Sequence, residues 1–89
     1  MLPQMFKTDD PFANPESAAK EFVRIAKREM EETGRSVAFT GTVNSAFTTG
    51  GRSTVASYSA GRDFAIDQGW ISIDGSGTRI TVTPEGEDA

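Results

Sequence analysis

Residues 68–86 read QGWISIDGSGTRITVTPEG, and this stretch decides which fold the chain can adopt. Ile71 and Ile73 alternate with polar residues, and so do Ile80 and Val82 on the other side of a DGSG sequence. Alternation with a period of two predicts two short strands that each bury one face, and the glycines permit the positive φ angles of a tight turn. The stretch therefore predicts a β-hairpin. Because an isolated hairpin is only marginally stable in water, its apolar face must pack against an earlier part of the chain.

A long amphipathic helix is predicted between Asn14 and Gly34. Asn14 suits the N-cap, Pro15 suits the first helical position, and Gly34 is placed to end the helix. Apolar side chains recur with the i, i+3, i+4, i+7 spacing of one helix face, at Ala19, Phe22, Val23, Ala26 and Met30.

The middle of the chain is ambiguous. Residues 36–43 are rich in β-branched side chains and alternate roughly, which favours a short strand that runs into a turn. Alternatively, Thr42 or Asn44 caps a brief helix that runs through Phe47. Residues 48–51 read TTGG and predict a turn in either case.

Two interpretations also fit residues 53–68. A helix, the preferred one, would place small side chains on one face, where they permit close packing, and would leave Val55, Tyr58, Ser59 and Arg62 on the opposite face. The face with the small side chains comprises Ala56, Ser57, Ala60 and Gly61, and it also includes Phe64. The strand interpretation stays open because Thr54, Val55 and Tyr58 favour strands.

Composition excludes most familiar active sites. The chain has 89 residues, enough for one small domain, and contains neither cysteine nor histidine. Disulfides, zinc sites built from Cys and His, thiol catalysis and histidine-based triads are therefore excluded. We expect no enzyme activity, no cofactor and no metal. No apolar run approaches the roughly 20 residues that a membrane span needs, and residues 1–12 lack the pattern of a signal peptide, so we expect a cytoplasmic protein.

The net charge is −4, from nine Lys and Arg against thirteen Asp and Glu. The electric field of a protein with this net negative charge repels polyanions on average. Only residues 36–62 are positive, because they contain Arg52 and Arg62 and no acid. A locally basic surface on an acidic protein is therefore an expectation that rests on two arginines.

The predicted order of elements resembles that of the winged helix-turn-helix superfamily over residues 16–86. Two junctions carry the resemblance: IDQGWI at residues 66–71, which matches an apolar-x-x-Gly-apolar-apolar exit from the second helix of the motif, and TPEG at residues 83–86, which matches a Thr-x-x-Gly exit from the last strand. The resemblance implies an α+β fold in which helices precede a C-terminal β-hairpin wing. The alternative fold is one helix packed on an antiparallel sheet formed by residues 36–83.

The chain is expected to divide into three parts. Residues 1–13 mix prolines, acids and isolated hydrophobic residues without a sustained period, which predicts a flexible N-terminal arm or a loosely packed extension. Residues 14–86 would form a single domain and residues 87–89 an acidic tail. A register counted back from Gly69 places Arg62 at a core position, whereas an exit loop one residue longer places Phe64 there. Trp70 is expected to pack the helix junction against the wing.

By the same resemblance, residues 53–68 would be a recognition helix that enters the major groove of double-stranded DNA. Arginine can hydrogen-bond a guanine edge or a phosphate, and hydroxyls commonly contact phosphates. The implied function is a small DNA-binding regulator, of phage or prophage type. The candidate binding residues are Arg52, Ser53, Tyr58, Ser59 and Arg62, with Thr78 and Arg79 in the wing.

The acidic balance favours a second hypothesis, because few cations are present to bind phosphates. The chain is similar in size and charge to small phage proteins that block host machinery, such as anti-CRISPR proteins. It would then be an inhibitor or adaptor that docks a host protein through the exposed Val55, Tyr58 and Arg62 face or through the first helix. A homodimer would instead double the basic footprint and favour DNA.

Overall fold

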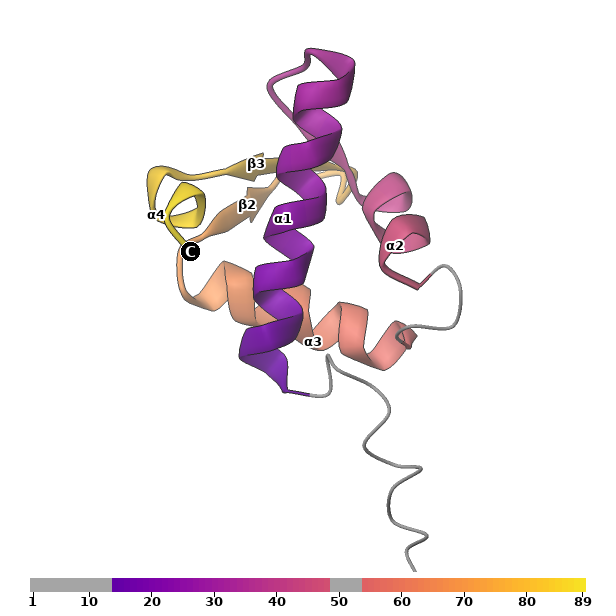
Figure 1. Cartoon of the computed structure of the whole chain (residues 1–89), viewed down its shortest axis with the longest axis vertical. Coiled ribbons are helices and arrows are strands. Elements are labelled where there is room, and N and C mark those ends of the chain that lie inside the picture. Colours follow the sequence, from indigo (N-terminus) through magenta and orange to yellow (C-terminus); the bar gives the residue numbers. More distant parts are fainter. Residues whose placement is uncertain (1–13, 49–53) are drawn as a thin grey trace, which may run out of the picture.

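The computed structural model describes residues 14–48 and 54–89. Within them the fold is α+β, with helices around a small antiparallel sheet (Figure 1). The elements in chain order are α1 (Pro15–Thr33), β1 (Ala38–Phe39), α2 (Thr40–Thr48), α3 (Val55–Asp67), β2 (Ile71–Ile73), β3 (Arg79–Val82) and α4 (Pro84–Glu87). The alternative fold, one helix on a sheet formed by residues 36–83, is wrong because α2 and α3 lie in that segment.

Helix α1 has the predicted boundaries. The Asn14 side chain accepts hydrogen bonds from the backbone N–H groups of Glu16 at 2.8 Å and Ser17 at 3.3 Å, and Gly34 ends the helix with a φ of 70°. The predicted apolar face is buried, with Met30 only partly so. Ala18, Ile25 and Glu29 are buried as well, because α1 contacts α2, α3, β1 and β3 from several sides.

The predicted hairpin is confirmed. β2 and β3 pair antiparallel with Ile73 opposite Ile80, and the turn between them includes Gly77 with a φ of 76°. β1 adds to the far side of β3, with Ala38 also opposite Ile80, so the strand order is β1-β3-β2. Ile71 and Ile80 are buried beneath the sheet, which gives the hairpin the packing partner that it needs.

The strand predicted at residues 36–43 is shorter than expected. It ends at Phe39, because Thr40 already begins α2. The Thr40 N–H donates to the carbonyl oxygen of Thr78 at 2.9 Å and its hydroxyl donates to that of Gly77 at 3.0 Å, so Thr40 joins the start of α2 to the hairpin turn. The alternative helix through Phe47 is confirmed, although it begins before Thr42.

Residues 55–67 are helical, and the strand interpretation of this segment is wrong. Thr54 caps α3 by accepting a hydrogen bond from the Ser57 N–H at 3.0 Å. Gly61 packs directly on α1: a Cβ atom at this position would lie 2.7 Å from the carbonyl carbon of Ala18. Figure 1 shows α3 running across α1. The predicted close packing by small residues therefore occurs, although Ala56 from the predicted face is exposed.

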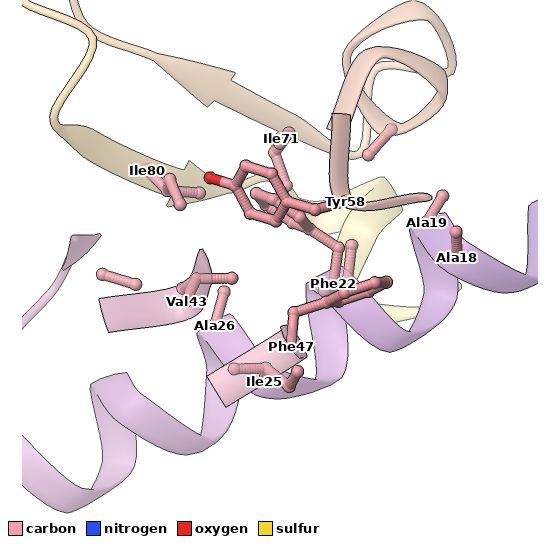
Figure 2. Close-up of a cluster of buried hydrophobic side chains, with 13 residues drawn as sticks. Ala18, Ala19, Phe22, Ile25, Ala26, Val43, Phe47, Tyr58, Ile71 and Ile80 are labelled. Carbon is pink, nitrogen blue, oxygen red and sulfur yellow. The ribbon is translucent and has the colours of Figure 1, made fainter. Parts of the chain in front are cut away.

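Tyr58 belongs to the core, which corrects the prediction that it lies on an exposed face (Figure 2). Its ring centroid lies 5.3 Å from that of Phe22 on α1 and 6.0 Å from that of Phe47 on α2. Tyr58 is only 6% exposed because its ring fills the space where α1, α2 and α3 meet.

Neither Arg62 nor Phe64 occupies the fully buried position that the two predicted registers gave them. Arg62 is only half-buried, and the fully buried residue of the last turns is Ala65. Phe64 is half-buried and packs edge to face on Trp70, with ring centroids 5.7 Å apart. Trp70 thus joins the helix junction to the hairpin, as predicted.

The last helix enters the segment predicted as a tail. Thr83 caps α4 by accepting a hydrogen bond from the Gly86 N–H at 3.1 Å. Glu87 is the last residue of α4, and its carboxylate lies 3.7 Å from the Lys27 ammonium group.

We predict that Gly61→Ala lowers the free energy of unfolding by about 1–3 kcal/mol, because the added methyl group overlaps the Ala18 backbone and forces the helices apart. Denaturant titration followed by circular dichroism measures this. The matched control is Gly41→Ala on α2, where a Cβ meets nothing within 4 Å, so that stability stays unchanged or rises. A Gly61→Ala variant as stable as the wild type would contradict the close contact.

Candidate partner-binding groove

A groove of about 420 Å³ lies between α2, α3 and the hairpin. Its lining residues are Thr40, Gly41 and Asn44 from α2, Tyr58, Arg62 and Ile66 from α3, and Ile73 and Gly77 from the hairpin. We call this surface the α2–α3–hairpin groove. It joins three elements that are separate in the sequence.

Helix α3 supplies one wall of the groove through a stripe of residues four apart. Tyr58, Arg62 and Ile66 follow the i, i+4, i+8 spacing, so they lie above one another on one side of the helix. Tyr58 is buried, Arg62 is half-buried and Ile66 is 42% exposed. The stripe therefore runs from the core at one end to solvent at the other. Ile66 is the exposed large hydrophobic residue of the described segments.

Hydrogen bonds fix the positions of the walls. The Tyr58 hydroxyl donates to the carbonyl oxygen of Thr40 at 3.3 Å, and Thr40 in turn is bonded to the hairpin turn through Gly77 and Thr78. Burial raises the pKa of the Tyr58 phenol above 10.0, and the nearby Arg62 charge partly offsets this. The phenol is therefore a hydrogen-bond donor at neutral pH.

Asn44 lines the groove from α2 and carries an unpaired side-chain oxygen. Its side chain is half-buried, and its Oδ1 atom is buried without a hydrogen-bond partner among the described residues. Buried acceptors are normally paired, and this oxygen is an exception that is closed to solvent.

Both described arginines at this surface are already paired with aspartates. The Arg62 Nε atom donates to Asp63 Oδ1 at 3.1 Å, while its guanidinium carbon lies 5.9 Å from the centre of the Tyr58 ring. In the hairpin turn, Arg79 Nη1 lies 3.3 Å from Asp74 Oδ2. Neither cation is available without the loss of an existing ion pair.

Asp74 organises the hairpin turn. Its carboxylate accepts hydrogen bonds from the backbone N–H groups of Thr78 and Arg79, each at 3.1 Å, and from the Ser76 hydroxyl. The Arg79 N–H, the Ser76 hydroxyl and the Thr78 N–H lower the pKa of Asp74 from 3.8 to about 2.

The predicted binding residues fall into three groups. Arg52 and Ser53 lie outside the described residues. Tyr58 and Arg62 line the groove, although Tyr58 does so from the core, and Gly77 brings the groove to the residue before Thr78. The remaining candidates lie outside the lining: Ser59 half-buried on α3, and Thr78 and Arg79 exposed at the turn.

Sequence reasoning missed the groove residues Thr40, Asn44, Ile66 and Ile73. Asn44 was considered only as a helix cap, and Ile73 only as a strand residue. Ile66 and Ile73 each precede an aspartate, but no pattern in the sequence brings these two isoleucines together.

The described residues hold no group of three or more Asp or Glu side chains that could bind a metal ion, and none of their helices is both long and apolar enough to cross a membrane. Comparisons with protein-family models, with curated proteins and with solved structures find no match to this chain.

We predict that the amide chemical shifts of Thr78 and Arg79 move together as Asp74 titrates near pH 2, rather than near the ordinary value of 3.8. Because the pKa is lower in the folded state, the carboxylate stabilises the turn above its unfolded-state pKa, and this stabilisation is lost as the pH falls through about 2. Two-dimensional NMR across this range measures it. In Asp74→Asn the coupled movement disappears, whereas a midpoint close to 3.8 in the wild type would contradict the hydrogen-bonded turn.

Proposed function

We propose that this chain is a non-enzymatic winged helix-turn-helix domain that binds a protein partner through the α2–α3–hairpin groove. The order of helices and strands supports the class: a long helix and a short strand precede two helices and a hairpin, and β3 lies between β1 and β2. In such a domain α3 would be the recognition helix and the β2–β3 hairpin the wing.

We favour a protein over DNA as the partner because the described arginines of α3 and the wing are paired with aspartates. Arg62 on α3 and Arg79 on the wing are each paired with an aspartate, and Asp67, the last residue of α3, adds a further negative charge to that helix. DNA affinity comes largely from Lys and Arg side chains that neutralise phosphates. Among the described residues of α3 and the wing, three aspartates stand against two arginines, and this balance opposes that interaction.

The apolar content of the groove suits a protein instead. Ile66 and Ile73 line it together with the Tyr58 side chain, and Ile66 is substantially exposed. Protein interfaces combine an apolar centre with polar groups around it, and here Thr40, Asn44 and Arg62 supply polar groups beside the isoleucines.

The second candidate is the DNA-binding regulator implied by the resemblance. The order of elements favours this candidate, because α3 directly precedes the hairpin, as a recognition helix precedes the wing in the resembled superfamily. It would have to rely on Arg52 and Ser53, or on arginines released from Asp63 and Asp74.

We predict that a labelled duplex of random sequence does not bind the wild-type chain, even at low salt, because the surface of α3 and the wing is acidic. Fluorescence anisotropy measures this. The double variant Asp63→Asn and Asp67→Asn, which removes two negative charges, is the matched comparison and should bind the duplex detectably at low salt and release it as salt is raised.

Binding of the duplex by the wild type, abolished by Arg62→Ala and weakened by salt, would support the regulator and contradict the protein-binding proposal.

A further inference from the structure

The chain itself contains a segment that suits the α2–α3–hairpin groove. We infer that residues 1–10, which lie outside the described residues, dock in this groove and cover it until a partner displaces them. This inference concerns the regulation of the groove, and it rests on the proposed function for the partner that would compete with the segment.

The apolar side chains of the segment match the apolar walls of the groove. Ile66 from α3 and Ile73 from the hairpin both line the groove, and neither is fully buried. A segment that covers both isoleucines removes their exposed apolar surface from water, which is favourable. Residues 49–53, which also lie outside the described residues, read TGGRS and offer no large apolar side chain. Residues 1–6 read MLPQMF and offer Met1, Leu2, Met5 and Phe6.

The charge of the segment is opposite to that of the groove. Among the described residues that line the groove, Arg62 is the one that carries a charge. Its partner Asp63 is the next residue and its side chain is 64% exposed, so this ion pair contributes little stability. Asp9 or Asp10 of the segment can therefore take the place of Asp63, in a contact from which the apolar residues exclude water.

The order of residues in the segment fits the order of residues along α3. Arg62 directly follows Gly61, which contacts Ala18 near the start of α1, whereas Ile66 lies one helical turn further toward the hairpin. Counted back from the start of α1, the chain supplies the two aspartates first and the apolar residues afterwards. The aspartates can therefore meet the arginine while the apolar residues meet the isoleucines.

The segment is also long enough. The chain between Phe6 and Asn14 has about eight residues, which span up to about 26 Å when extended. Asn14 and Ala18 are one turn apart, about 5.4 Å along α1, and Ala18 lies against α3. Half the circumference of a helix about 10–12 Å in diameter adds about 17 Å. Phe6 can therefore reach around α3 to the groove.

Paramagnetic broadening of NMR signals in the full chain tests this inference. The wild type contains no cysteine, so Gln4→Cys carries a nitroxide label at a single position. We expect the label to broaden the amide signals of Ile66 and Ile73 more than the signal of Glu32, which lies near the other end of α1.

Two comparisons separate docking from tethering. Phe6→Ser in the same labelled chain keeps the length of the segment and removes an apolar side chain, so the excess broadening at the isoleucines should be lost. Asp9→Asn together with Asp10→Asn should reduce this broadening in part. In a mixture of nitroxide-labelled chain and isotope-labelled chain without nitroxide, the signals of the isotope-labelled chain should stay sharp.

The outcomes distinguish this inference from the proposed function. Equal broadening with and without Phe6→Ser, or broadening confined to residues next to Asn14, would overturn the inference. Broadening in the mixture would overturn it too, because the segment would then dock on a second copy. Each of these results leaves the groove open to a protein partner, whereas binding of a random duplex by the wild type contradicts the proposed function separately.

Discussion

The contact between Gly61 and Ala18 is the constraint on which the rest of this structure depends. It lets the backbone of α3 lie directly on α1, at a distance that no larger residue permits. With α3 held there, Tyr58 reaches the core between Phe22 and Phe47, and the next residues of its stripe face the hairpin. A small residue on a buried face thereby positions the groove on another face of the same helix.

The groove needs a second link, between α2 and the hairpin. Thr40 supplies it, because its backbone N–H and hydroxyl bond the hairpin turn and its carbonyl oxygen accepts from Tyr58. Asp74 holds the turn itself in shape. The aspartate that orders the turn also neutralises Arg79, so the interactions that build this surface reduce its attraction for phosphate.

Much of the fold could be predicted from local patterns. The caps at Asn14 and Gly34, the alternation of the hairpin and the small side chain at Gly61 each act through neighbouring residues or a single contact, which the sequence records directly. The exposure of Tyr58 was predicted wrongly, because a helical projection separates two faces but does not say that α1 and α2 bury α3 from two directions. The groove could not be predicted at all, because Asn44 and Ile73 line the same groove only through the way in which the elements pack.

The claim that this surface binds protein rather than DNA is tested most directly by two-dimensional NMR of the labelled chain. One sample receives a random-sequence duplex at low salt, and the other receives the same buffer without the duplex. The account predicts that the duplex leaves the amide signals of Asn44, Ile66 and Gly77 in place. Movement of the α3 and wing signals by the duplex, reversed by added salt, would contradict it.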